Sequence, residues 1–326
     1  MRDVAELAGV SRQLVSIVLR GAAGASASSR ARILAAAEEL GYHPDDSARM
    51  LRRRRSGQIG VLFTMQQPFE VDLVNELQRR AEAHDYTLSL STMSHDRSQR
   101  AALQQLMRQR IEALIALDAQ DGAGVIEGLP RGIPSLLLGG PVSAERHDLV
   151  QVENDVGIAL AIDHLTSLGH RRLAYVGPEH GPNAEGRIAA FRAETAGRRL
   201  SGRVIPSDYS EAGGFRAASE LLAESPSDRP TALVCVNDHC AIGVLHTLVR
   251  AGVGIPEDIS IVGFDDSTAA GLPYVRLTSV RPDPAHMAEL AIETLRDRLA
   301  DLQAPSLTRS VTPTLTIRGS TAPPRD

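Results

Sequence analysis

The sequence predicts an α/β protein in which a three-helix head with a helix-turn-helix is joined by a hinge helix to a two-lobed, doubly wound domain. Three observations predict this. The first 41 residues contain three short segments with helical signals, residues 52–55 are four consecutive arginines, and from Ile59 onward short apolar runs alternate with amphipathic segments of helical period. Apolar strands separated by helices are typical of a parallel sheet covered on both faces.

Length and composition limit the class of protein. The chain has 326 residues, which corresponds to two or three domains, and its 43% apolar and 23% charged residues are ordinary for a globular protein. No apolar run approaches the ~20 residues of a membrane span, and the first residues mix both charge signs, unlike a signal peptide. We therefore expect a cytoplasmic protein with no membrane partner.

Several enzyme classes are excluded by residues that the sequence lacks. All 35 basic residues are arginine, so there is no lysine for a phosphate-binding loop, a Schiff base or a kinase site. The ten histidines show no repeated ligand spacing, and Cys235 and Cys240 are too few for a zinc site. We expect two reduced, buried thiols, no metal, no cofactor and no enzymatic activity.

The head is basic and the rest of the chain is acidic. Residues 1–57 contain ten arginines and six acidic residues, a net charge of +4, whereas residues 58–326 carry −9. A small basic head on an acidic body indicates that the head contacts a polyanion.

Helix signals in the head predict a helix-turn-helix. We expect helices over residues 2–8, over 12–20 after a Ser11 cap, and from a Ser26 cap to Gly41. An apolar seam would join the first two helices across a turn at Gly9, and it consists of Ala5, Leu7, Val10, Val15 and Val18. The second helix would then present its first residues to the major groove. Arg12 pairs well with guanine and Gln13 with adenine, while a generic helical hairpin is the alternative.

The remaining chain is too long for one sheet, so we expect two doubly wound lobes with a ligand cleft at the carboxyl ends of their strands. The predicted domains are the head (1–43), the hinge helix and linker (44–57), the two-lobed domain (58–320) and a disordered tail (321–326). Lobe 1 would comprise residues 58–151 and 284–310, and lobe 2 residues 152–281 and 311–320. Residues 311–321, VTPTLTIRGST, are expected to form one last strand.

Several motifs, in order, resemble those of the lactose-repressor (LacI/GalR) family of bacterial transcription regulators. They are DVAELAGVS, RILAAAEELGY, PDDSARML, LGHRRLAYVG, VNDHCAIG, IPEDISIVGFDD and RGST. The resemblance covers nearly the whole chain and implies a periplasmic-binding-protein-like fold for the two lobes. It departs from the family at Ile17, where an arginine is usual, at Asp45, where the hinge cap is usually asparagine, and at Met1, which lies a few residues after the usual start.

The resemblance also implies a DNA-binding surface and an effector site. In such regulators a hinge leucine, here Leu51 with Ala48 beside it, wedges into the minor groove, and we expect Arg52 and Arg53 to contact phosphates rather than to form a solvated linker. The complete predicted DNA-binding set is Ser11, Arg12, Gln13, Ser16, Ile17, Ala48, Leu51, Arg52 and Arg53.

The effector-binding residues that the resemblance implies are Phe69, Arg187, Tyr209, Asn237 and Asp265. Arg187, Asn237 and Asp265 lie where strands lead into helices, the usual ligand position in an open α/β sheet. Taken singly, Asn237 or Asp265 could be a helix cap and Phe69 a core residue. Gly139-Gly140 replaces an aspartate found in many sugar-binding relatives, which argues against a simple sugar.

We therefore expect an effector-controlled repressor. It would bind a pseudo-palindromic operator on double-stranded DNA as a homodimer, or as a tetramer, and a small molecule such as a sugar or related metabolite in the cleft. The alternative is a stand-alone periplasmic-type sugar-binding protein. Such a protein would need a signal peptide and would lack the basic head. A sugar kinase would need the lysine and the phosphate loop that the sequence lacks.

Overall fold

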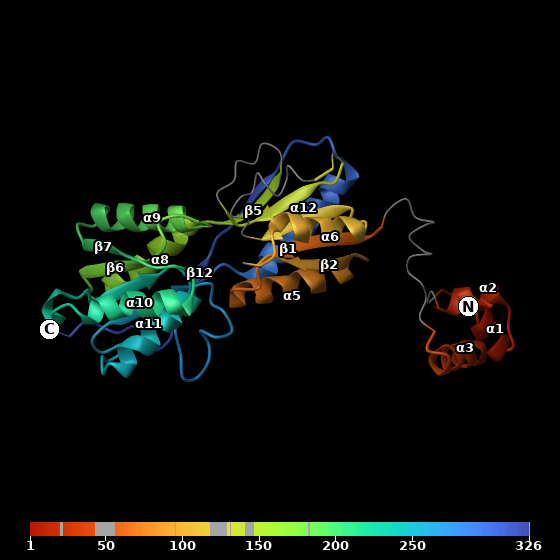
Figure 1. Cartoon of the computed structure of the whole chain (residues 1–326), viewed down its shortest axis with the longest axis horizontal. Helices are drawn as coiled ribbons and strands as arrows, with labels where there is room; N and C mark the ends of the chain where they lie inside the picture. Colours follow the sequence, from red (N-terminus) through yellow and green to blue (C-terminus); the bar gives the residue numbers. More distant parts are fainter. Residues whose placement is uncertain are drawn as a thin grey trace. The chain divides into compact units, whose positions relative to one another are not determined.

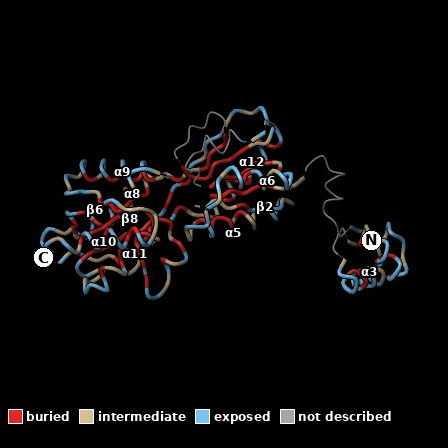
Figure 2. The backbone as a smooth tube through the Cα atoms, in the orientation of Figure 1, coloured by how far each residue is buried: buried red, intermediate tan, exposed pale blue. Residues whose placement is uncertain are grey.

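The structure is a computed structural model. It describes residues 1–19, 22–42, 56–94, 96–117, 129–130, 132–140, 147–181 and 183–325. The chain forms two compact units, Met1–Ser56 and Gly57–Asp326. Each unit has its own buried core, drawn in red in Figure 2, and each is described by itself.

The first unit contains α1 (Arg2–Leu7), α2 (Arg12–Leu19) and α3 (Ala27–Glu39). One small core joins them, made of Val4, Ala5, Ala8, Val15, Val18, Ile33, Ala36 and Ala37. Both predicted caps are present, because the Ser11 hydroxyl accepts a hydrogen bond from Leu14 N–H and the Ser26 hydroxyl accepts one from Ser29 N–H, each at 3.2 Å. The turn after α1 passes through Gly9 at φ +64°, which costs glycine little.

One residue of the predicted seam lies outside this core. Leu7 is 49% exposed, whereas Val4 is fully buried. At about 3.6 residues per turn, Val4, Ala5 and Ala8 share one face of α1 and Leu7 lies to its side. The expectation for Leu7 was therefore wrong, and Val4 takes its place.

Lobe 1 of the second unit is built on a six-stranded sheet in which all strands are parallel, in the order β11-β5-β4-β3-β1-β2. The strands are β1 (Gln58–Phe63), β2 (Thr87–Thr92), β3 (Ala113–Leu117), β4 (Ser135–Leu138), β5 (Asp148–Val152) and β11 (Thr308–Val311). Because side chains alternate along a strand, Val61 and Phe63 join the core with α5 (Pro68–Glu82) and α12 (Pro284–Ala300), while Leu62 joins the core with α6 (Gln99–Arg108). Helices thus cover both faces.

Lobe 2 repeats this plan with the order β12-β10-β9-β8-β6-β7. Its strands are β6 (Arg172–Gly177), β7 (Ser201–Pro206), β8 (Ala232–Cys235), β9 (Ser260–Phe264), β10 (Thr278–Arg281) and β12 (Thr314–Thr316). Its helices are α8 (Asn154–Ser167), α9 (Ala184–Gly197), α10 (Glu211–Leu222), α11 (Asp238–Arg250) and a short 3-10 turn, η1 (Pro226–Asp228). Figure 1 shows α8 and α9 on one face of this sheet and α10 and α11 on the other. Only β12, at the edge, is antiparallel to its neighbour.

The chain passes between the lobes three times. It crosses from β5 to α8, from β10 to α12, and from β11 to β12. Each lobe therefore contains segments that are far apart in the sequence, and the larger buried core runs through both lobes. The two parallel-sheet lobes and the helical head confirm the predicted fold class.

The sequence-based expectations were wrong at the end of the chain. Residues 311–321 do not form one strand, since β11 ends at Val311 in lobe 1 and β12 lies in lobe 2. The predicted disordered tail is instead ordered up to Arg325. Ala322 N–H donates to the Ser260 hydroxyl at 3.0 Å, the His164 ring contacts the Thr321 hydroxyl at 2.9 Å, and Arg325 pairs with Asp258 at 2.6 Å.

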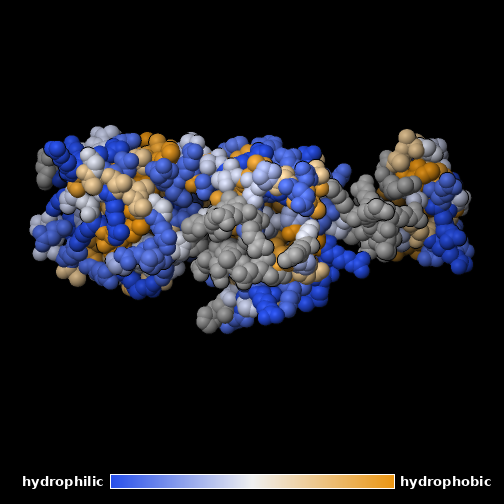
Figure 3. All heavy atoms as spheres, turned by 90° about the horizontal axis from the view of Figure 1, so that it is seen from above, coloured by the Kyte–Doolittle hydropathy of each residue, from blue (hydrophilic) through white to orange (hydrophobic). Residues whose placement is uncertain are grey.

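Two strands of lobe 2 were not predicted, because their sequences contain no apolar run. β7 is an edge strand with four exposed residues among six, and β10 buries Thr278 and Ser279 in place of aliphatic side chains. Figure 3 shows that hydrophilic residues cover most of the visible surface of the second unit, with hydrophobic residues in separate patches. No helix in the described part of the chain is long and apolar enough to cross a membrane.

Candidate functional site

The first turn of α2 faces away from the core of the head. Arg12 and Gln13 are exposed, whereas Val15 and Val18, further along the helix, are buried. Ser11, which caps the helix, is also exposed. The helix can therefore present guanidinium and amide groups to a partner while its apolar side anchors it.

Two further predicted DNA-binding residues are half-buried. Ser16 and Ile17 follow in the second turn of α2, and Ile17 lies beside the loop before α3, where a Cβ on Gly24 would be 3.7 Å from its Cγ2. The four predicted hinge residues lie outside the described residues; they are Ala48, Leu51, Arg52 and Arg53.

A pocket lies between the lobes of the second unit, at the carboxyl ends of their strands. Four of the five predicted effector-binding residues line it, namely Phe69, Arg187, Tyr209 and Asp265. The other lining residues described are Gln67, Glu70, Leu73, Leu117, Leu138, Gly139, Val152, Asn183, Pro282 and Met287. These four residues therefore meet at the edge where open α/β sheets usually bind their ligands.

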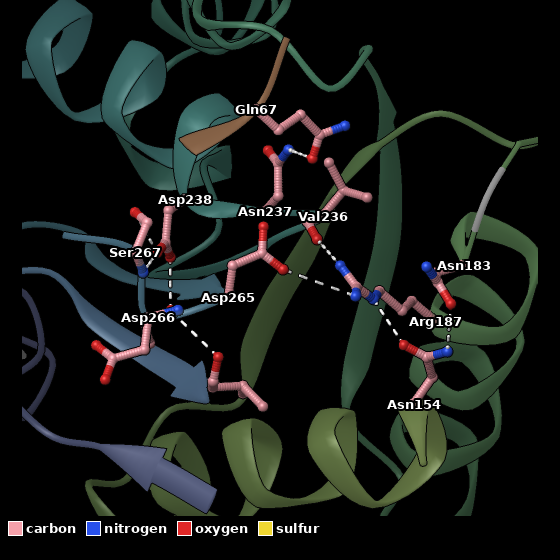
Figure 4. A network of polar contacts seen from close by, with 12 residues as sticks. Gln67, Asn154, Asn183, Arg187, Val236, Asn237, Asp238, Asp265, Asp266 and Ser267 are labelled. Carbon is pink, nitrogen blue, oxygen red and sulfur yellow. Dashed lines mark hydrogen bonds and ion pairs between the residues drawn. The ribbon is translucent and has the colours of Figure 1, made fainter. Parts of the chain in front are cut away.

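Arg187, in the first turn of α9, is buried and held on several sides. Its Nε donates to Asn154 Oδ1 at 2.8 Å, and one terminal nitrogen donates to the Val236 carbonyl. The guanidinium carbon lies 3.5 Å from the centroid of the Phe264 ring, a cation–π contact. Its other terminal nitrogen lies 3.9 Å from Asp265 Oδ1, as Figure 4 shows. The positive charge is therefore fixed at the edge of the pocket.

Asp265 follows β9 in a backbone conformation that non-glycine residues seldom adopt, with φ +108°. Its N–H donates to the Val280 carbonyl at 2.7 Å. Strain of this kind persists only where the surroundings hold the backbone in place, and it is found most often at binding sites.

Asp238 provides part of that support from the start of α11. Its buried carboxylate accepts hydrogen bonds from Ser267 N–H at 2.7 Å, from the Ser267 hydroxyl at 2.9 Å and from the Ser279 hydroxyl at 2.5 Å. Burial raises the pKa of Asp238 to about 7, and the nearby Asp266 carboxylate adds to the rise, while the three hydrogen bonds oppose it. The carboxylate thus fixes the loop that carries Asp265.

Asn237 does not line the pocket but connects several of its parts. Its Oδ1 accepts from Cys240 N–H at 2.8 Å and so caps α11. Its Nδ2 donates to the Tyr209 carbonyl and to Gln67 Oε1, both at 3.1 Å, and the Gln67 contact crosses from lobe 2 to lobe 1 (Figure 4). Asn237 is therefore a helix cap, as the alternative interpretation expected. Its amide also joins the two lobes.

Two aromatic residues border the pocket from opposite lobes. Phe69 comes from the first turn of α5 and is partly buried against the core. Tyr209 precedes α10, and its hydroxyl lies so close to Gly181 that a Cβ there would be 2.7 Å from it. Gly181 has φ +123°, so this position favours glycine both for space and for backbone conformation.

The two walls of the pocket differ in chemistry. Lobe 1 contributes mainly apolar side chains, which are Phe69, Leu73, Leu117, Leu138, Val152 and Met287. Its Glu70 carboxylate already accepts hydrogen bonds from Thr64 Oγ1 at 2.7 Å and from Gln66 N–H at 3.1 Å. Lobe 2 contributes the polar groups of Asn183, Arg187 and Asp265. The pocket therefore suits a molecule with a polar side and an apolar side.

Some residues of the site were missed from the sequence. Gln67, Asn154 and Asn183 all position or border the predicted residues. Asn154 begins the helix that follows β5, so the strand-to-helix rule could have found it. Within the described residues, no group of three or more His, Cys, Asp or Glu side chains could hold a metal ion.

Each of the two units matches a known protein family. Residues 1–45 match the model of the bacterial regulatory proteins of the lacI family, and residues 162–321 match that of a periplasmic binding protein-like domain. The HTH-type transcriptional regulator GalR of Salmonella typhimurium is 30% identical over 333 residues, covering 100% of this chain and 97% of the relative.

Further similarities extend over the whole length. The ribose operon repressor of Escherichia coli K12 is 31% identical, with 98% of this chain and 99% of the relative covered. The crystal structure of a lac repressor dimer bound to operator and the anti-inducer ONPF has a TM-score of 0.77 and 28% identity over 98% of each chain. With relatives of 30% and 31% identity over almost its whole length, and with a helix-turn-helix head and a two-lobed domain, this chain belongs to the lacI family of bacterial DNA-binding transcription regulators.

Proposed function

We propose that the protein is an effector-responsive repressor that binds a pseudo-palindromic operator as a homodimer. A small, neutral molecule with hydroxyl groups, a sugar or a related metabolite, controls it from the pocket between the lobes. The observation that carries this proposal is the pair formed by Arg187 and Asp265 at the polar wall of the pocket, 3.9 Å apart.

The opposite charges of this pair favour a hydroxyl over an ionised group. A hydroxyl can accept a hydrogen bond from Arg187 and donate one to Asp265. An anionic group would meet the Asp265 carboxylate, and a cationic group would meet the Arg187 guanidinium. The apolar wall formed by lobe 1 would pack against the less polar side of the same molecule.

Base recognition is assigned to the first turn of α2. Arg12 and Gln13 are exposed there, and their side chains match guanine and adenine edges in the major groove. Ser11, Ser16 and Ile17 would lie along the same surface, and Ala48, Leu51, Arg52 and Arg53 remain the predicted hinge contacts. The lac repressor, to which the chain is similar, is a dimer in its operator-bound structure.

A stand-alone sugar-binding protein of the periplasmic type is the other candidate, because the two lobes alone would suit it. The head favours a regulator, since residues 1–45 match a DNA-binding family. DNA binding therefore separates the two functions.

The experiment is selection of an operator from a random duplex pool, followed by binding titrations at several salt concentrations. Each phosphate contact should add about −0.9 to the slope of log affinity against log salt. A slope near zero would contradict the proposal. A thermal-shift screen of sugars and nucleosides then identifies an effector, because a ligand of the folded state raises the unfolding temperature. Light scattering of the operator complex distinguishes a dimer from a tetramer.

A further inference from the structure

Side chains at the start of α5 in lobe 1 reach across the pocket to lobe 2. Gln67 Oε1 accepts a hydrogen bond from Asn237 Nδ2 at 3.1 Å. In the second turn, the Asp72 carboxylate accepts longer hydrogen bonds from Thr268, at 3.3 Å from its hydroxyl and 3.4 Å from its N–H. Both contacts end on the two loops of lobe 2 that carry Asn237 and Asp265.

The Gln67 side chain is available for this contact because another residue holds the helix start. Gln67 occupies the N-cap position of α5 but its side chain forms no cap hydrogen bond. The buried Glu70 carboxylate reaches back instead, to Gln66 N–H at 3.1 Å and to Thr64 Oγ1 at 2.7 Å. Loss of the Gln67 amide would therefore leave the start of α5 in place.

The Asn237 amide has its other bonds within lobe 2. Its Oδ1 caps α11 through Cys240 N–H, and one Nδ2 hydrogen is directed to the Tyr209 carbonyl. The remaining Nδ2 hydrogen is directed to Gln67. This last bond is the one that breaks when the lobes separate, while the two others stay within lobe 2.

We propose that Gln67 is a positioning residue whose hydrogen bond with Asn237 holds the lobes together and so sets how readily the pocket opens. The inference rests on the proposed function in taking this pocket as the effector site. Asp72 and Thr268 provide a second, weaker contact in the same place. The bond also joins the loop beside the polar wall to α5, which packs against α12 and β2 of lobe 1.

The distance between the lobes can be measured with spin labels in the full-length, ligand-free protein. One label is placed at Ala83→Cys, just after α5, and the other at Glu220→Cys on α10, both at exposed positions. The two native cysteines are fully buried, so the labels go to the introduced thiols. Labelled protein is diluted with unlabelled protein so that pulsed electron resonance records distances within one chain.

Gln67→Ala is expected to shift the distribution to longer distances. The ratio of closed to open chains should fall about three- to tenfold, the effect of one hydrogen bond between neutral groups. Gln66→Ala is the matched control, because it removes the neighbouring, exposed amide and should leave the distribution unchanged. Gln67→Glu keeps an oxygen acceptor for Asn237 and should also resemble the wild type.

A Gln67→Ala distribution identical to that of the wild type would overturn the inference. So would an equal shift in Gln66→Ala, since the effect would then not depend on the bond to Asn237. Operator binding is measured on the same proteins: if no variant and no wild-type protein binds any selected duplex, the proposed function fails while the positioning role of Gln67 is judged by the distances alone.

Discussion

The guanidinium of Arg187 and the carboxylate of Asp265 approach to 3.9 Å between a terminal nitrogen and Oδ1. This is close enough for attraction and too long for a hydrogen bond. Both side chains are largely buried, and other contacts hold each of them: Asn154 and Val236 bind the arginine, and the backbone of Asp265 bonds to Val280. The gap between them is therefore built into the site and suits a hydroxyl group.

Asp265→Asn should abolish the response to an effector while ligand-free operator affinity stays within a few-fold of wild type. The substitution keeps the shape but replaces one acceptor oxygen by an NH2 donor and removes the charge, so a ligand hydroxyl loses its charge-assisted hydrogen bond. A ligand shifts a conformational balance only by its difference in affinity for the two states. The measurement is operator affinity with and without a sugar or nucleoside found by thermal shift. An undiminished response at the same ligand concentration would place the effector elsewhere. Unfolding of the variant would indicate a structural role for Asp265.

The site could be predicted from the sequence only where a local rule applied. Arg187 and Asp265 were found because each follows a strand, and open α/β sheets bind ligands there. The contact between Gln67 and Asn237 joins residues 170 apart and depends on how the lobes meet, so no local pattern shows it. β10 was missed because the hydroxyl of Ser279, bonded to Asp238, replaces the aliphatic side chain that marks a buried strand.

Arg12→Ala should weaken operator binding by about 1–3 kcal/mol and relax the base preference at one position. Arg12 is exposed at the start of α2, where a side chain can reach base edges. Arg32→Ala is the matched control, because it removes an exposed arginine from α3 of the same head. Binding to the selected operator and to random duplex is compared for both variants. If Arg12→Ala lowers both affinities equally, its contact is to the DNA backbone.

Asp238→Asn should change how stability depends on pH. The folded-state pKa of Asp238 is raised to about 7 by burial, above the value of about 3.9 in an unfolded chain. A raised pKa means that the folded state holds the proton more tightly, so this contribution is fully present below about pH 4. It is lost as the pH rises to about 7, and it stays lost above that. Asparagine cannot titrate and escapes this loss.

The unfolding temperatures of the wild type and Asp238→Asn should therefore be compared at pH 5, 6.5 and 8. Asparagine loses one acceptor for the Ser267 and Ser279 donors at every pH, so the variant is expected to be less stable at pH 5. The deficit should shrink as the pH rises, since only the wild type then buries a charge. A deficit that is constant from pH 5 to 8 would show that Asp238 does not titrate in this range.

Gly243→Ala should destabilise lobe 2 because two helices meet there backbone to backbone. A Cβ on Gly243 of α11 would lie 2.1 Å from the Glu211 carbonyl oxygen of α10, and one on Gly214 of α10 would lie 2.1 Å from the Cys240 carbonyl oxygen. Neither carbonyl can move without displacing its helix, and overpacking of this kind costs about 1–3 kcal/mol or more. α10 begins just after Tyr209, which lines the pocket, and α11 begins just after Asn237, which bonds to Tyr209 and Gln67. The same change should therefore weaken effector binding.

The control for this prediction is Gly197→Ala at the end of α9. A Cβ there would meet no atom within 4 Å, and the backbone has no positive φ. Alanine should therefore leave stability unchanged or raise it by about 0.4–1 kcal/mol through the unfolded state. Chemical denaturation of both variants compares the two free energies of unfolding. Equal stability of Gly243→Ala and Gly197→Ala would mean that α10 and α11 can separate without cost. In that case the close helix crossing is not what positions Tyr209 and Asn237.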